Sequence, residues 1–325
     1  MNRPLHIRAA DPMRCHTRGK PAIKRDPRAH LMGGSSLILS AAIIIGITAC
    51  GENYEPTPLA SDAFVDMSGV VVPHPLTALA GPAAAADFNQ FSFSVELPSA
   101  VLAAGLDVPP LAEMPLSSTC TTTPSAYCAF GFNSVDVTTR SSGLACLVQD
   151  TRAANQRFEA TFGGLASTRS IEEALAGSAD MPLASLRAFA IPRAVTGIMA
   201  ALLSANKGAV VSSADLLESG YVLGMALDEL GRPVEGATVG VAPLDESIPA
   251  LFDIYYLHIV EGVPFFDQTT TSASGFGAFL AVPTRARPMT AAVWFLIPAA
   301  EDTRQFSPGV AVATTGAAFA LFLLP

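Results

Sequence analysis

Few residues of this chain could carry metal or covalent chemistry. The 325 residues include five histidines and five cysteines. His258 and Glu261 have the His-x-x-Glu spacing that can hold zinc, but no later histidine could complete the ligand set. A strand in which Leu257 and Ile259 face one way and His258 the other explains the same residues. We therefore predict no metal site and no cofactor.

Patterns for nucleophilic catalysis are also missing from the sequence. It contains no G-x-S-x-G motif, no Walker loop and no G-x-G-x-x-G stretch. The carboxylate pairs Asp228/Glu229 and Asp245/Glu246 lack the dense Asp and Asn run of a calcium loop, so we interpret them as solvated turn charges. We predict no catalytic residue. An acid-based active site within residues 86–210 is the alternative.

Cys50 follows an uncharged run, residues 37–49, in which isoleucine is frequent. A membrane-spanning helix needs about 20 apolar residues, whereas thirteen suit the apolar region of a secretory signal. We therefore predict that residues 1–49 are a signal peptide that is removed. Met1 or Met13 fits as the start, because Met32 would leave no basic residue ahead of the run. The basic residues closest upstream are Arg14, Arg18, Lys20, Lys24, Arg25 and Arg28.

The residues Ile47-Thr48-Ala49-Cys50 resemble the lipobox of bacterial lipoproteins. The resemblance implies that a diacylglyceryl group is attached to the sulfur of Cys50 and that the signal peptidase cuts just before it. Two or more acyl chains hold a protein firmly on a bilayer, so we expect the membrane as a partner, through lipid on Cys50. In enterobacterial lipoproteins, an Asp two residues after the lipobox cysteine favours retention in the inner membrane. This chain has Glu52 at that position, so we expect it in the outer membrane or at the cell surface.

The charge balance excludes nucleic acid as a partner. Eight of the 19 Lys and Arg and two of the 28 Asp and Glu lie in residues 1–49. The remaining chain carries 11 basic and 26 acidic residues, a net charge of −15. Binding to phosphates requires clustered basic residues, which this chain lacks. Attachment to anionic lipid would likewise depend on acyl chains and not on charge.

Three cysteines follow Cys50, and disulfides persist in exported proteins. We favour a bond between Cys120 and Cys128, which closes a short polar loop, and interpret Cys146 as a small buried strand residue. A bond between Cys128 and Cys146, across two neighbouring predicted strands, is the alternative.

Alternating apolar residues predict a mixed, mainly β domain over residues 86–210. Helical periodicity adds two short helices to it. Residues 50–85, rich in Pro and Ala, are predicted to be a lipid-anchored tether that contains a short edge strand at 69–76. The expected strands of the domain are 91–97, 128–137, 143–150 and 157–165, and the expected helices are 170–178 and 194–208.

Residues 221–283 resemble the carboxypeptidase-regulatory-like domain, and we expect the domain itself to extend over residues 221–325. Its pattern is a strand ending in D-x-x-G, then P-V-x-G-A, then a G-x-F before Val-Pro. The resemblance implies an Ig-like or transthyretin-like β-sandwich, so the expected fold class is mostly β with minor α. Turns at Gly231 and Gly277 should need positive φ. The matching residues are Asp228, Gly231, Pro233, Val234, Gly236, Ala237, Gly277 and Phe279.

Aromatic residues gather on the long connection between the two halves of this pattern. We interpret them as core residues, like Trp294, with a glycan- or peptide-binding surface as the alternative. The leading hypothesis is a non-enzymatic, lipid-anchored cell-envelope protein with an interaction or structural role and an unknown protein or glycan partner. An enzyme or enzyme accessory is the rival class. The aromatic residues are Phe252, Tyr255, Tyr256, Phe265 and Phe266.

Overall fold

The structure of the protein is a computed structural model. All of its described residues belong to one compact unit, Thr57–Pro325. The predicted signal peptide and Cys50 lie outside the described residues, as does the pair Asp245/Glu246. The described residues are 63–85, 88–104, 108–122, 125–139, 143–176, 182–243, 252–267, 269–285, 289–299 and 308–324, with residues 302, 304 and 306.

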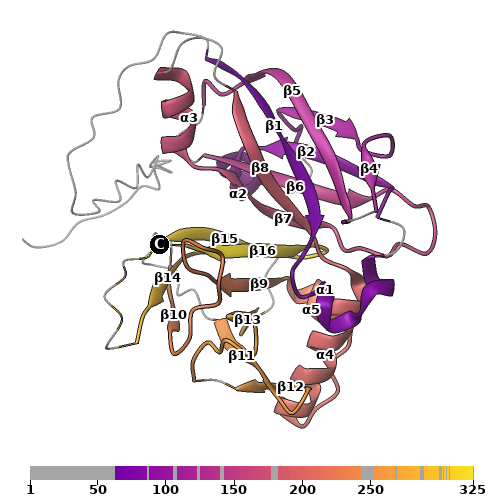
Figure 1. Cartoon of the computed structure of the whole chain (residues 1–325), viewed down its shortest axis with the longest axis vertical. Coiled ribbons are helices and arrows are strands. Elements are labelled where there is room, and N and C mark those ends of the chain that lie inside the picture. Colours follow the sequence, from indigo (N-terminus) through magenta and orange to yellow (C-terminus); the bar gives the residue numbers. More distant parts are fainter. Residues whose placement is uncertain are drawn as a thin grey trace, which may run out of the picture. The chain divides into compact units, whose positions relative to one another are not determined.

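Most elements of the described chain are strands, arranged in three sheets (Figure 1). The largest has nine strands in the order β12-β11-β13-β9-β16-β7-β6-β2-β3. Its middle strand, β16, pairs in parallel with both β9 and β7. The sheet therefore runs through both segments that the sequence suggested as separate domains. In the same order the strands are Val263–Asp267, Phe252–Val260, Ala278–Pro283, Tyr221–Ala226, Ala318–Leu323, Thr161–Ala166, Leu144–Asp150, Phe91–Glu96 and Ala112–Pro115.

A four-stranded sheet, in the order β4-β5-β1-β8, packs on the β2 and β6 part of the large sheet. Val65, Met67 and Val71 of β1 point into this core. The prediction of a short edge strand within a tether is therefore wrong. Strand β1 is longer than expected, and it is paired with β5 on one side and with β8 on the other. The proline and alanine residues on both sides of this segment hid the longer strand. The strands are β4 (Cys120–Thr121), β5 (Tyr127–Asp136), β1 (Phe64–Pro73) and β8 (Leu183–Ala190).

A three-stranded sheet covers the opposite face of the large sheet at β9, β13 and β16. Its central strand carries Trp294, which is fully buried and stacks on Phe279 of the large sheet at a ring distance of 6.1 Å. The prediction that Trp294 is a core residue is confirmed, and so is the β-sandwich. The strands, in order, are β10 (Thr238–Pro243), β14 (Met289–Ile297) and β15 (Gly309–Thr314).

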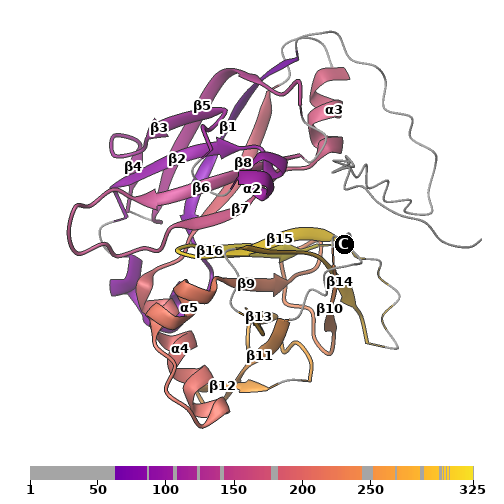
Figure 2. The ribbon, with the colours of Figure 1, turned by 180° about the vertical axis from the view of Figure 1, so that it is seen from behind.

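Helices α4 (Arg193–Lys207) and α5 (Ser213–Ser219) lie on the same face of the large sheet as the four-stranded sheet, farther along towards β11 (Figure 2). Successive side chains of β16 point to opposite faces of the large sheet, which explains why each face is covered by a layer. Ala318 and Ala320 face the helices, whereas Phe319 faces the three-stranded sheet. The prediction of a mostly β fold with minor α is thus confirmed.

The helices follow their sequence signals closely. The expected helices at 170–178 and 194–208 are α3 (Thr168–Ala176) and α4, and α4 stops at Gly208, whose φ is 63°. Helix α5 begins with a capping box between Ser212 and Asp215 that the sequence reading missed. No helix in the described chain is both long and apolar enough to cross a bilayer. The remaining helices are α1 (Thr77–Ala80), the 3-10 helix η1 (Pro82–Ala85) and α2 (Pro98–Ala104).

The two expected positive-φ turns are present. Gly231 has a φ of 73° and Gly277 a φ of 65°. A Cβ on Gly277 would also lie 2.4 Å from the carbonyl oxygen of Ala226. Both glycines are therefore required by the backbone, as the turn chemistry predicts.

His74 is buried where β1 ends and α1 begins. Its Nδ1 accepts a 3.3 Å hydrogen bond from the backbone N–H of Leu76, and its ring contacts those of Phe189 and Phe322. Its Nε2 has no hydrogen-bond partner in the described chain. Burial lowers the pKa of His74 to about 3. The folded state therefore keeps this imidazole neutral over a wide range of acidic pH.

We expect this imidazole to make the protein less stable in acid. The unfolded imidazole has a pKa of about 6.5 and binds a proton that the folded one rejects, so stability falls as pH drops from about 6.5 towards 3. At pH 5 the loss is about 2 kcal/mol. Urea unfolding at pH 7 and pH 5 measures it. The free energy of unfolding of His74→Phe should fall correspondingly less between pH 7 and pH 5. An equal fall in the variant and the parent would show that His74 does not cause the loss of stability in acid.

Candidate functional site

The cysteines expected to form a disulfide are joined. Cys120 of β4 and Cys128 of β5 are cross-strand partners and form the bond. Cys146 of β6 is free and buried, as predicted, and burial raises its pKa to about 12. A thiol in this state is a packing residue and not a reactive nucleophile. The alternative bond between Cys128 and Cys146 is excluded by this pairing.

The aromatic residues of 252–266 form the hairpin β11–β12 and not an open loop. The side chains of Tyr255, Tyr256 and Phe266 are buried, which confirms the core interpretation for these three. Phe252 packs edge-on against Trp294 at a ring distance of 4.9 Å. Phe265 is 39% exposed, beside His258. The hairpin therefore presents a single accessible ring, which is too little for an aromatic binding platform.

His258 lies in β11 and contacts no metal-binding cluster of described residues. Its Nε2 lies 3.0 Å from the carbonyl oxygen of Thr270, and Glu261 occupies the exposed turn of the hairpin with a φ of 52°. Within the described ranges, no three or more His, Cys, Asp or Glu side chains gather closely enough to hold a metal ion. The interpretation of His258 as a strand residue is confirmed by its place in β11.

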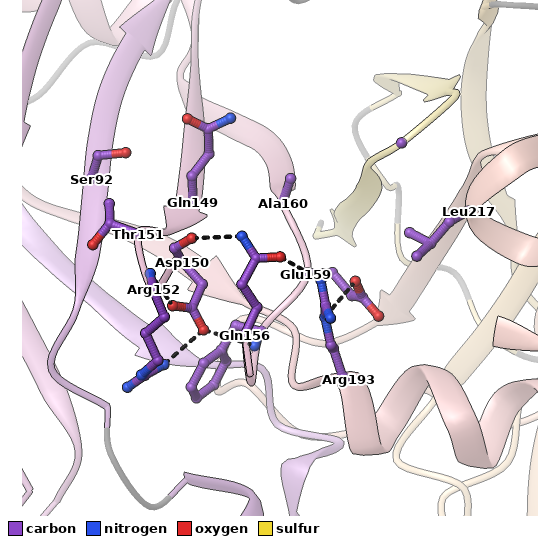
Figure 3. A pocket seen from close by; sticks show the side chains of 12 residues that line it. Ser92, Gln149, Asp150, Thr151, Arg152, Gln156, Glu159, Ala160, Arg193 and Leu217 are labelled. Carbon is purple, nitrogen blue, oxygen red and sulfur yellow. Dashed lines mark hydrogen bonds and ion pairs between the residues drawn. The ribbon is translucent and has the colours of Figure 1, made fainter. Parts of the chain in front are cut away.

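A polar pocket elsewhere in the molecule is the best candidate for a functional site (Figure 3). It has a volume of about 410 Å³. The ends of β2 and β6, the loop 151–160 and the start of α4 form most of its wall. Leu217 of α5 and Gly316 of the turn before β16 complete the rim. The pocket therefore lies where the two halves of the large sheet meet the helices.

Asp150 organises the loop that follows β6. Its carboxylate accepts backbone hydrogen bonds from Arg152, Arg157 and Phe158, at 3.1, 2.7 and 3.2 Å. The guanidinium of Arg152 donates to the same carboxylate at 2.7 Å. The side chain of Asp150 is 1% exposed, so this buried ion pair is well satisfied. The loop wraps around one carboxylate, which explains its fixed shape.

A second ion pair anchors α4 to the loop that precedes β7. Glu159 is buried, and its Oε2 lies 3.4 Å from Nε of Arg193, the first residue of α4. Burial raises the pKa of Glu159, while Arg193 and a hydrogen bond from Thr196 oppose the rise. The hydroxyl of Thr196 also lies 2.8 Å from that of Tyr221, and burial raises the pKa of this tyrosine. Glu159, Thr196 and Tyr221 are buried, and with the half-exposed Arg193 they form one polar chain from the loop before β7 to β9.

Gln156 links the two ion pairs. Its amide nitrogen donates to the backbone oxygen of Asp150 at 3.1 Å, and its amide oxygen accepts from Arg193 at 2.5 Å. Figure 3 shows this amide between the two clusters. Both carboxylates are therefore committed to fixed partners. A general acid or base needs a carboxylate that is free to reach a substrate, and the pocket offers polar binding groups instead.

Sequence reasoning did not single out these residues. They lie on a strand end, a loop and a helix start, and each is ordinary by itself. Two signals were present: an Asp followed two residues later by Arg in "DTR", and Glu159 within the alternating run "RFEATFGGL". A charged residue at a buried strand position requires a partner, but the sequence does not tell which residue supplies it.

Comparisons with known proteins give distant similarity only. No protein-family model and no curated protein matches the chain. Among solved structures, the chain is similar to the shaft pilin SpaA from Lactobacillus rhamnosus GG, with 8% identity, 81% of this chain and 98% of that chain covered, and a TM-score of 0.21. It is also similar to a streptococcal ancillary pilin, with 8% identity, coverages of 80% and 68%, and a TM-score of 0.22. A third similar structure is the TIE protein of Bacillus anthracis, with 10% identity, 72% of this chain and 34% of that chain covered, and a TM-score of 0.20. This likeness is too distant to assign a family or a function.

Proposed function

We propose that this protein is a non-enzymatic, lipid-anchored protein of the bacterial cell envelope, in which Cys50 carries the lipid and the β-sheets form a binding or structural module. The lipobox-like sequence supports the anchor. The disulfide between Cys120 and Cys128 fits an exported protein, because such bonds persist outside the cytoplasm. Placement at the outer membrane or cell surface belongs to the same proposal.

The observation that carries the non-enzymatic part is the state of the two pocket carboxylates. Asp150 is held by three backbone N–H groups and a guanidinium, and Glu159 is held by Arg193 and Thr196. Such groups position a loop and a helix. Hydrolase activity of the purified protein that a single substitution abolished would contradict this part of the proposal.

We also propose that residues 221–325 are related to the carboxypeptidase-regulatory-like domain. The turn at Asp228–Arg232 supports the relation, because the Asp228 carboxylate accepts hydrogen bonds from the backbone N–H groups of Leu230 and Arg232. Val234 then enters the core and is 1% exposed. These are the roles that a D-x-x-G turn followed by P-V would fill.

Replacing the proposed acylated cysteine tests the anchor. We expect the parent protein, made in its own host with an alkyne-labelled palmitate, to carry the label and to sediment with membranes. Cys50→Ala should be unlabelled and should retain residues 1–49, because the acyl acceptor and the cleavage signal are lost together. Mass spectrometry of the N-terminal peptide and in-gel detection of the label measure both effects.

Cys15→Ala is the matched control, since Cys15 lies in the segment that should be removed, and it should behave like the parent. Density separation of inner and outer membranes tests the placement. Persistent label in Cys50→Ala, or a parent protein with residues 1–49 attached and a bare Cys50 thiol, would overturn the proposal.

A further inference from the structure

The charges that line the polar pocket cancel within the protein. Two acidic and two basic side chains line it, and they pair as Asp150 with Arg152 and Glu159 with Arg193. A ligand with a net charge would find no unpaired opposite charge, and it would have to give up its hydration without compensation. The pocket is therefore unsuited to an ionic ligand.

Uncharged polar side chains supply the open hydrogen-bonding capacity. Ser92 of β2 and Gln149 of β6 are cross-strand partners, and Thr151 follows directly after β6. All three line the pocket. None of their side chains makes a hydrogen bond within the described part of the chain. Figure 3 shows the three side chains grouped on one side of the pocket. Two hydroxyls and one amide can each both donate and accept.

The shape of the pocket is fixed before any ligand arrives. The Asp150 bonds hold the loop, and Gln156 joins that loop to Arg193 of α4. Fixed polar groups lower the entropy cost of binding a polar ligand. The volume of about 410 Å³ lies within the range of roughly 300 to 1,000 Å³ that small-molecule sites occupy.

We propose that this pocket binds a neutral, polyhydroxylated ligand, namely an uncharged saccharide unit. Hydroxyl groups match the donors and acceptors of Ser92, Gln149 and Thr151, and they need no opposite charge. The aromatic residue of the lining, Phe158, is 1% exposed and offers no stacking face, so the binding of a single sugar is weak. This site is distinct from the hairpin β11–β12, and the inference goes beyond the proposed function because it does not depend on the lipid.

Saturation-transfer NMR on the full-length protein tests the inference. The protein is kept in a detergent whose headgroup is not a sugar, because a glycosidic detergent would compete for the pocket. The neutral probes are glucose, galactose and N-acetylglucosamine, and the charged probes are glucuronic acid and glucosamine. We expect saturation of at least one neutral sugar and a weaker signal from its charged counterpart.

The double variant Gln149→Ala/Thr151→Ala should weaken the binding of that neutral sugar by about tenfold, because two side-chain hydrogen bonds are lost. Both side chains are exposed, so the fold should be unaffected. Ser68→Ala/Asn133→Ala is the matched control, because these two exposed residues lie on β1 and β5 and do not line the pocket. It should bind like the parent.

Three results would overturn the inference. They are the absence of a signal from every neutral sugar, a stronger signal from the charged sugars, and equal binding by the double variant and the parent. None of these results bears on whether Cys50 is acylated, which the labelling experiment decides separately.

Discussion

Gly275→Ala is expected to destabilise the protein by at least about 3 kcal/mol, or to prevent folding. Gly275 lies in the turn before β13, pressed against β11. A Cβ there would lie 1.6 Å from the backbone oxygen of Leu257 and 2.4 Å from its carbonyl carbon. Neither atom can move without separating β11 from its neighbours. Urea unfolding followed by far-UV circular dichroism measures the loss.

Gly164→Ala is the matched control for this prediction. It lies in β7, and nothing is within 4 Å of the position that its Cβ would occupy. We expect its stability to stay within about 0.5 kcal/mol of the parent. If both variants unfold at the same urea concentration as the parent, the turn does not approach β11 as closely as described.

Trp294→Ala is expected to cost about 3 to 5 kcal/mol. The indole is fully buried between the two sheets, where it contacts the rings of Phe279 and Phe252. Its Nε1 donates to the backbone oxygen of Ala311 at 3.4 Å. The substitution leaves a large cavity at the centre of the sandwich. Circular dichroism must follow the unfolding, because this is the only tryptophan in the chain.

Two further substitutions give the scale for this result. Trp294→Phe keeps an aromatic ring in the core and should cost clearly less than Trp294→Ala. Phe64→Ala removes a ring that is 53% exposed, and we expect a change of at most about 0.5 kcal/mol. A loss for Trp294→Ala no greater than that for Phe64→Ala would show that the three-stranded sheet does not pack as described.

The sequence predicted individual elements better than their assembly. Alternation and turn residues identified β2, β5, β6, β7 and the turns at Gly231 and Gly277, because these signals are local. The strand β1 was hidden by proline and alanine on both sides of it. The pairing of β16 with β7 could not be foreseen, because it joins segments more than 150 residues apart and depends on which edges meet.

The candidate site was unpredictable for a related reason. The Cys120–Cys128 bond was predicted because the two residues are close in sequence and the loop between them is polar. The pocket instead combines a strand end, a loop and the start of α4, and its key contacts depend on the three-dimensional fold. Arg193 meets Glu159 only because α4 begins beside the loop that precedes β7. Tertiary contacts of this kind leave a trace in sequence only as a charge at a buried position.

The place of β16 within the large sheet has a consequence for synthesis. Strands β7 and β9 are synthesised before β16, and each lacks its parallel neighbour until β16 has been made. Until then both strands present an unpaired edge, which invites mispairing with other chains. A chaperone that shields such intermediates should therefore raise the yield of this protein, and premature stop codons before residue 318 should give products that are cleared by proteolysis.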